Sequence, residues 1–237
     1  MRYSMRYTID RFTKSLLLIA MLLSFIPAAM ASRQGDAENK GEKHISKVLF
    51  LGDSMTGWMA ERLNAYGATN GFEVSTIVWD GSTIKKWAAS PRLKSLIAAQ
   101  KPDAVIIGLG MNELFEPNPA KTLDAKVDKI VEAVGDRPFL WIGPPSWPGH
   151  DKGAVLDKWL GEKLGEENYF SSFDLTLPRQ SKTNPHPTRE GIIQWMDRVI
   201  SWIPTGSNLR FKSLESPGPK AMSRGKTFIY KRMRESL

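Results

Sequence analysis

Cysteine is absent from this chain of 237 residues, and its absence excludes several kinds of chemistry at once. A chain without cysteine forms no disulfide, offers no thiolate to a metal and has no cysteine nucleophile or cysteine-linked lipid anchor. Histidine is also scarce, because only His44, His150 and His186 are present. A histidine-rich metal site is therefore not expected.

A continuous field of positive charge is also lacking, although the formal net charge is +8. Residues 1–31 carry +3 and residues 204–237 carry +6, which leaves residues 32–203 at −1. A protein that binds nucleic acid needs a basic surface that follows the phosphates. The nearly neutral central region therefore excludes nucleic acid as an expected partner.

The longest apolar run, Leu16 to Ile26, is shorter than the roughly 20 residues that a membrane-spanning helix needs. Basic residues precede it and Ala29-Met30-Ala31 follows it, a pattern typical of a cleavable secretory signal over residues 1–31. We expect an exported protein, periplasmic or secreted, that contacts the membrane only if this segment stays uncleaved. Residues 32–45 are polar and predict a flexible lead-in.

Residues 46–203 alternate between β-rich apolar runs and segments with helical spacing, which indicates parallel βαβ units in one three-layer α/β domain. The basic, Pro- and Gly-containing stretch 204–237 predicts a disordered tail. The expected strands cover 46–51, 72–79, 104–109, 138–143 and 169–173. The expected helices cover 55–68, 90–100, 119–134, 153–165 and 188–202.

The segment Gly52-Asp53-Ser54 ends the first apolar run and opens a helical pattern. A serine at such a strand–turn–helix junction lies near free backbone N–H groups, which favour developing negative charge. Ser54 is therefore a candidate nucleophile. The alternative is that Ser54 only caps the helix that follows.

Polar residues follow every expected strand, and the carboxyl ends of parallel strands share one edge of a sheet. Acyl transfer needs a nucleophile, a base and donors aimed at the oxyanion. Ser54 can be the nucleophile and His186 the base, while the backbone N–H groups of Ser54 and Gly81 and the amide of Asn112 can form the oxyanion hole. Alternatively, His186 packs at a helix start, and Gly81 and Asn112 are turn residues.

Four segments occur in the order and spacing of the sequence blocks of the SGNH (GDSL-type) hydrolases, and this similarity spans about residues 46–203. They are Gly52-Asp53-Ser54, Gly81, Gly110-Met111-Asn112-Glu113 and His186-Pro187-Thr188. The resemblance implies a flavodoxin-like αβα sandwich with a parallel sheet of about five strands. It also implies ester hydrolysis through Ser54 and His186, with Gly81 and Asn112 in the oxyanion hole and neither metal nor cofactor.

The chain departs from the family pattern in two places. Glu113 stands where an aspartate usually follows the asparagine, and Thr183 stands where an aspartate usually precedes the catalytic histidine by three residues. Three outcomes follow from Thr183: a Ser-His dyad oriented by a backbone carbonyl or by Thr183, an acidic partner from elsewhere such as Asp174 or Asp151, or a weakened or lost activity. Asp53 is a further candidate to support the pair.

The resemblance and the expected export together predict an esterase acting on short-chain, O-acetyl esters of small molecules or of cell-envelope glycans. Trp58, Trp147 and His150 are candidate substrate contacts near the expected site edge. One alternative is an O-acyltransferase that uses the same serine. The other is a non-catalytic glycan-binding or scaffold protein that has lost the orienting aspartate.

Overall fold

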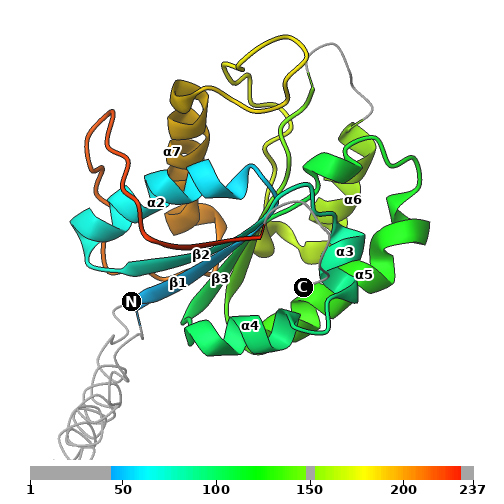
Figure 1. Cartoon of the computed structure of the whole chain (residues 1–237), viewed down its shortest axis with the longest axis horizontal. Helices are drawn as coiled ribbons and strands as arrows, with labels where there is room; N and C mark the ends of the chain where they lie inside the picture. The colour runs from blue at the N-terminus through cyan, green and yellow to red at the C-terminus, as the bar shows by residue number, and fades with distance from the viewer. Residues whose placement is uncertain (1–43, 148–152, 231–237) are drawn as a thin grey trace, which may run out of the picture. The chain divides into compact units, whose positions relative to one another are not determined.

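The computed structural model describes residues 44–147 and 153–230, with side chains up to Phe228 (Figure 1). The expected signal segment, most of the expected lead-in and the candidates His150 and Asp151 lie outside the described residues. None of the described helices combines the length and the apolar character that crossing a membrane requires.

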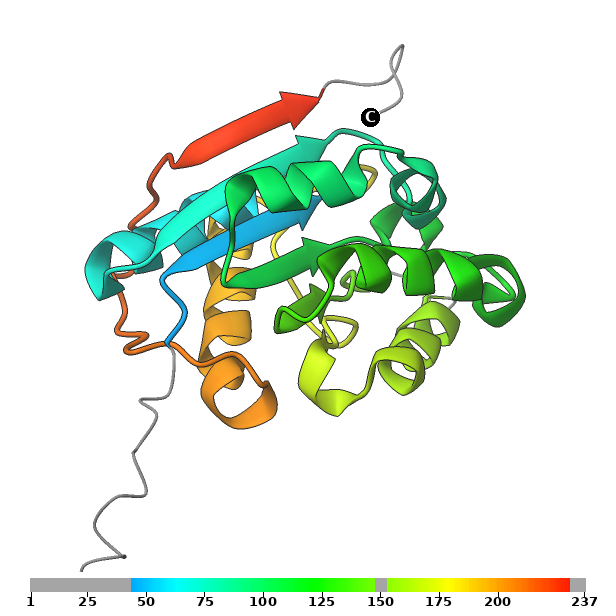
Figure 2. The ribbon, with the colours of Figure 1, turned by 90° about the horizontal axis from the view of Figure 1, so that it is seen from below.

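A single sheet of six strands forms the middle layer, and every neighbouring pair in it is parallel (Figure 2). Its order is β5-β4-β3-β1-β2-β6, which is the flavodoxin-like order with one more strand beside β2. The α/β prediction is therefore confirmed, with one strand more than expected. The strands are β1 (Lys47–Gly52), β2 (Glu73–Trp79), β3 (Ala104–Gly108), β4 (Phe139–Ile142), β5 (Tyr169–Phe170) and β6 (Lys226–Tyr230).

Helices cover both faces of the sheet, and each face has its own apolar core. The helices α2 (Thr56–Asn70) and α7 (Arg189–Gly206) pack on one face. The opposite face carries α3 (Ile84–Ala89), α4 (Leu93–Gln100), α5 (Pro119–Val134) and α6 (Ala154–Leu164). Two 3-10 turns, η1 (Met111–Glu113) and η2 (Glu166–Asn168), complete the described elements.

Local sequence explains where these elements begin and which faces they bury. In α5, the side chain of Asn118 accepts a hydrogen bond from the Lys121 N–H, and Pro119 occupies the first turn, where its missing N–H costs nothing. The strands β1 and β3 are buried on both faces, as continuous apolar runs of a parallel sheet should be. The start of α5 therefore follows from capping, and the central place of β1 and β3 in the sheet follows from their burial on both faces.

The structure corrects the prediction of a disordered tail after residue 203. Helix α7 continues through Pro204 to Gly206, and residues 207–230, here called the C-terminal arm, run past α2 and end as β6 beside β2. Arg62 of α2 is fully buried and holds the arm by donating to the carbonyl oxygens of Gly218 and Ala221, each at 2.8 Å. It also pairs with Asp197 of α7 at 2.7 Å.

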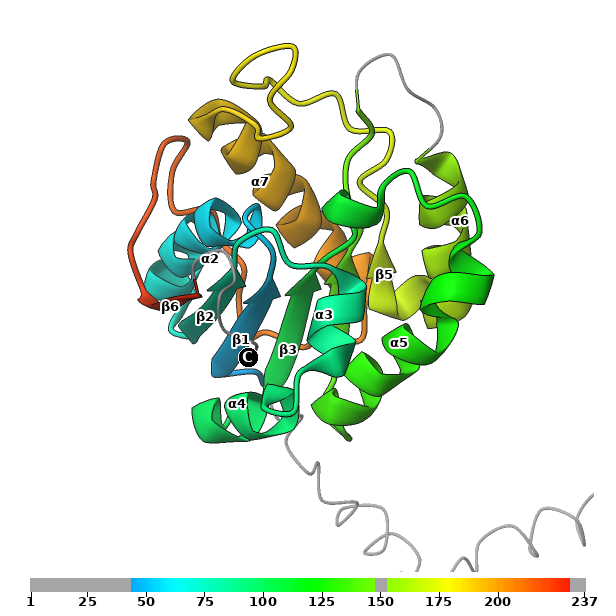
Figure 3. The same cartoon turned by 45° about the vertical axis from the view of Figure 1, so that its right-hand side comes forward.

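All six strands end at one edge of the sheet, which lies next to the loop leading into α7 (Figure 3). After β1 the chain forms β2 on one side and then crosses to form β3 on the other, so the strand order reverses at β1. Sites in parallel α/β sheets form outside the carboxyl ends of the strands at such a reversal. The Gly52-Asp53-Ser54 turn leaves β1 at this position.

Candidate active site

Ser54 lies in the turn between β1 and α2, and it does not cap the helix. Helix α2 begins at Thr56, and Met55 occupies the N-cap position without a capping side chain. The Ser54 Oγ instead lies 2.9 Å from Nε2 of His186, which comes from the loop before α7. Gly52 permits this turn, because a Cβ there would lie 2.1 Å from the Gly108 carbonyl oxygen.

The other nitrogen of the His186 ring contacts Asn184. The Asn184 Oδ1 lies 2.9 Å from His186 Nδ1 and accepts a hydrogen bond from the His186 backbone N–H at 3.0 Å. Because a backbone N–H only donates, the Asn184 atom at this position is its oxygen, and Nδ1 must carry the ring proton of the neutral imidazole. Nε2 is then an acceptor for the Ser54 hydroxyl, which is the tautomer that a general base needs.

Asn184 therefore occupies the role for which the sequence had suggested other residues. Thr183 is exposed, and its hydroxyl lies 3.4 Å from Ser181 Oγ rather than against the imidazole. Asp174 is also exposed and forms no hydrogen bond to His186. The usual orienting group of a catalytic histidine is an acid, and an amide two residues before the histidine has no recognisable sequence pattern.

The environment of His186 favours its neutral form. Burial lowers the pKa of this imidazole below its usual 6.5; the carboxylate of Asp80 opposes the effect and the cation of Arg179 adds to it. A group that accepts a proton from serine must be uncharged beforehand. His186 is thus in its base form at neutral pH.

A hairpin-like loop holds the His186 backbone in place. Arg179 bridges two segments, since its guanidinium donates to the carbonyl oxygens of Pro185 and Ser146. The Gln180 N–H donates to the His186 carbonyl at 3.1 Å, and the Gln180 side chain accepts from Asn184 Nδ2 at 2.9 Å. The imidazole and its amide partner are therefore fixed by one hydrogen-bonded loop.

Gly81 and Asn112 lie at the ends of β2 and β3, the two strands that flank β1. In the described part of the chain, the backbone N–H groups of Ser54 and Gly81 donate to no other protein group. Gly81 adopts φ +65°, a conformation that favours glycine. Asn112 Nδ2 donates one hydrogen to the Ser82 carbonyl at 2.6 Å and keeps its second hydrogen for a further acceptor.

Two carboxyl groups are buried directly beside these residues. Asp53 is 2% exposed and accepts from the Met55 N–H at 3.0 Å, and burial raises the pKa of its carboxyl to about 7. Glu113 is 7% exposed, and burial raises its pKa to about 7 as well. Among residues 44–147 and 153–230, no group of three or more acidic or histidine side chains is arranged to hold a metal ion.

A pocket of about 250 Å³ opens beside the Ser54–His186 pair. Trp58, which is 48% exposed, is one of the residues that line this pocket. Trp147 does not line this pocket, and His150 is outside the described residues. The complete lining consists of Ser54, Met55, Trp58, Gln180, His186, Pro187 and Ile192.

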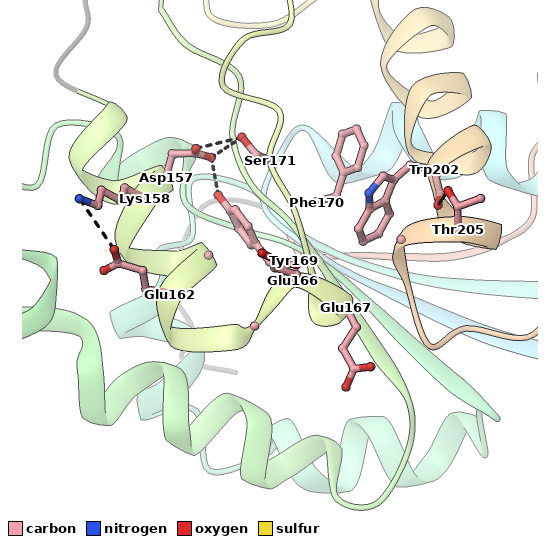
Figure 4. Close-up of a pocket in the computed structure, with 13 residues that line it drawn as sticks. Asp157, Lys158, Glu162, Glu166, Glu167, Tyr169, Phe170, Ser171, Trp202 and Thr205 are labelled. Carbon is pink, nitrogen blue, oxygen red and sulfur yellow. Dashed lines mark hydrogen bonds and ion pairs between the residues drawn. The ribbon is translucent and has the colours of Figure 1, made fainter.

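A larger groove of about 940 Å³ lies elsewhere, between α6, β5 and the end of α7 (Figure 4). Its side chains include Trp202, Phe170 and several carboxylates, of which Asp157 accepts from the Tyr169 hydroxyl at 2.7 Å. The groove shares no lining residue with the Ser54–His186 pocket. The two hollows are therefore separate features of the molecule.

No protein-family model and no curated protein sequence matches the chain. Solved structures do match it. TesA is 21% identical, with a TM-score of 0.54, over 67% of this chain and 98% of its own. A protein assigned to the lipolytic G-D-S-L family from Desulfitobacterium hafniense DCB-2 is 20% identical, with a TM-score of 0.52, over 65% and 97%.

A family 3 carbohydrate esterase from Clostridium thermocellum is 16% identical, with a TM-score of 0.52, over 67% of this chain and 94% of its own. At such identities the likeness concerns the arrangement of the backbone. The chain has the fold of the SGNH-type hydrolases.

Proposed function

We propose that this chain is a serine esterase that hydrolyses short-chain carboxylic esters by acyl-enzyme chemistry. The observation that carries the proposal is the continuous chain of contacts from Ser54 Oγ to His186 Nε2 and from His186 Nδ1 to Asn184 Oδ1, each 2.9 Å long. A nucleophile, a base and an orienting group in this order are what nucleophilic catalysis requires. Ser54 and His186 both line the 250 Å³ pocket.

In the acylation step, the Ser54 Oγ attacks the ester carbonyl carbon while its proton moves to His186 Nε2. The free N–H groups of Ser54 and Gly81 and the second hydrogen of Asn112 Nδ2 are the donors available to the resulting oxyanion. When the carbon–oxygen bond to the alcohol breaks, His186 returns the proton to the leaving alkoxide. The acyl group then remains on Ser54.

In the deacylation step, water takes the place of the alcohol. His186 accepts a proton from this water as the oxygen attacks the acyl carbon. The bond between the acyl carbon and the Ser54 Oγ then breaks, His186 returns the proton to the Oγ, and the carboxylic acid leaves. Asn184 keeps the ring in the required tautomer in both steps. As a neutral amide, it orients the imidazole but adds no full negative charge to stabilise the imidazolium.

The walls of the pocket favour a small acyl group joined to a bulky, polar alcohol. Met55, Pro187 and Ile192 provide apolar surface around a limited volume, whereas Gln180 and Trp58, which also line the pocket, are exposed. Aromatic rings offer an apolar face on which sugar rings can stack. With the predicted secretory signal, this supports O-acetyl esters of cell-envelope glycans as substrates of an exported enzyme.

The test is turnover of p-nitrophenyl acetate by purified residues 32–237, compared with Ser54→Ala and His186→Ala. We expect each substitution to lower kcat by at least about 10³-fold, because the nucleophile and base act as a unit. Ser95→Ala is the matched control, since Ser95 is an exposed serine on α4, remote in sequence from the pocket residues. It should leave kcat unchanged.

Turnover equal to that of Ser54→Ala would rule out the esterase proposal. Release of p-nitrophenol that rises with added sugar acceptor, with acetyl-sugar rather than acetate as the product, would identify an O-acyltransferase using the same serine.

A further inference from the structure

We propose that Glu113 is a positioning residue of the oxyanion hole, which holds the segment Gly81–Ile84 against the turn that carries Asn112. This inference rests on the proposed function. It assigns a role to a residue at which the chain departs from the family pattern.

Two hydrogen bonds join the loops that follow β2 and β3. Asn112 Nδ2 donates to the Ser82 carbonyl at 2.6 Å, and the Ile84 N–H donates to Glu113 Oε1 at 2.7 Å. Because β1 lies between β2 and β3, these bonds connect the two loops across the end of β1, which leads into the Ser54 turn. Consecutive residues of η1 thus secure the segment that starts at Gly81.

Stability alone gives a poor reason for a carboxylate at this position. Glu113 is 7% exposed, and its Oε2 has no hydrogen-bond partner within the described residues. A buried carboxylate with an unpartnered oxygen costs free energy of folding. Its Oε1 accepts a hydrogen bond from the N–H of Ile84, the first residue of α3 and three residues after Gly81, so precise placement of this loop is the benefit that offsets the cost.

Two charged groups influence Glu113 from neighbouring elements: Asp53 from the turn after β1 and Lys85 from α3. Lys85 also pairs with Glu116 at 3.3 Å. Burial raises the pKa of Glu113 to about 7, the Ile84 N–H opposes this, and Asp53 adds to it. The ionised carboxylate is a stronger acceptor than the protonated one, so the hydrogen bond from the Ile84 N–H to Glu113 weakens as the pH falls through 7.

The test compares Glu113→Ala, Glu113→Gln and the control Glu116→Ala. Glu113→Ala removes the acceptor and should lower kcat about 10- to 100-fold while KM changes less than about 2-fold. Glu113→Gln keeps an acceptor oxygen and should restore kcat at pH 8 to within about 3-fold of wild type. Glu116→Ala removes a nearby carboxylate from the same segment and should leave kcat unchanged.

Two further readouts separate positioning from a general loss of structure. In an Asn112→Ala background, Glu113→Ala should cost less than about 3-fold, because the hole it positions is already impaired. In wild type, kcat should fall in two steps below pH 8, whereas Glu113→Gln should show only the step due to His186.

An unchanged kcat in Glu113→Ala, an equal loss in both backgrounds, or an identical pH profile for Glu113→Gln would each overturn the proposal. Failure of the esterase proposal itself has a different signature, namely wild-type turnover no greater than that of Ser54→Ala.

Discussion

At the scale of single residues, the site separates two tasks that one aspartate usually performs. Asn184 fixes the tautomer of His186 through its oxygen, but it contributes no full charge. The charge that raises the pKa of His186 comes from Asp80, at the end of β2, and burial outweighs it. Orientation and charge stabilisation therefore come from different segments of the chain.

Asn184→Asp should raise the pKa of His186, because a carboxylate next to Nδ1 stabilises the imidazolium. In wild type the pKa of His186 lies below 6.5, so the loss of rate that is due to His186 occurs only as the pH falls below that value. In Asn184→Asp the loss should begin at higher pH, while the maximal kcat rises. NMR titration of the His186 Cε1 proton measures the shift directly.

Asn184→Ala is the companion variant, since it removes the acceptor without adding charge. It should lower kcat about 10-fold or more because the imidazole loses its orienting contact. Identical His186 titration curves in wild type and Asn184→Asp would contradict the assigned contact.

The residues that stand in known sequence motifs could be predicted from the sequence. The residues that position them could not. Ser54 and His186 stand in recognisable motifs, and the structure brings them within hydrogen-bond distance. Asn184 and Glu113 act through their distance to a ring nitrogen and to a backbone N–H, which depends on loop geometry. The conformation of this loop depends on distant contacts such as the hydrogen bond from Arg179 to the Ser146 carbonyl, and such contacts cannot be recognised from the neighbouring sequence.

At the scale of elements, β6 extends the sheet beyond the five expected strands. It covers the outer edge of β2, pairing from Ser75 with Lys226 to Trp79 with Tyr230. Phe228 packs against the core on the α3–α6 face. The arm therefore both protects an edge strand and adds apolar contact.

A chain ending at Gly225 should be less stable than a chain ending at Tyr230, which serves as its control. Without β6, the edge of β2 loses its partner and is open to pairing with another chain. The unfolding temperature should fall by about 4 °C or more, and association should increase with concentration. Thermal unfolding and light scattering measure both effects; equal midpoints and equal masses would show that β6 is dispensable.

Long elements with a clear period were easier to predict than short ones. The α5 prediction, 119–134, matches the observed helix because capping and the apolar stripe agree. The six-residue α3 was missed, since it is too short to show a period, and its start depends on Thr83 and on the distant Glu113. The strand β6 was missed because its pairing partner lies about 150 residues away.

At the scale of the whole molecule, the two buried carboxyls of the candidate site make folding depend on pH. In the unfolded chain, Asp53 and Glu113 lose their protons near their ordinary pKa values of 3.8 and 4.5. In the folded chain they keep them up to about pH 7. Between these values the folded state binds more protons, so the free energy of unfolding decreases as the pH rises.

The free energy of unfolding should therefore be lower at pH 8 than at pH 5, by on the order of 2 kcal/mol for each of the two carboxyls. Urea unfolding at both pH values measures the difference. The double variant Asp53→Asn/Glu113→Gln should lose this decrease. His186, whose pKa is lowered, contributes with the opposite sign in both proteins, and an unchanged slope in the variant would refute the assignment.

The parallel pairing of β6 with β2 has a practical consequence for handling the protein. Tyr230 lies opposite Trp79, at the carboxyl ends of the strands, where the Ser54 pocket lies. Strand β1 begins with Lys47 at the opposite, amino-terminal ends of the strands. An affinity tag or surface linker fused after β6 would start on the side where the Ser54 pocket lies. A linker placed before β1 starts on the far side, so amino-terminal immobilisation is the better choice for assays with polymeric glycans.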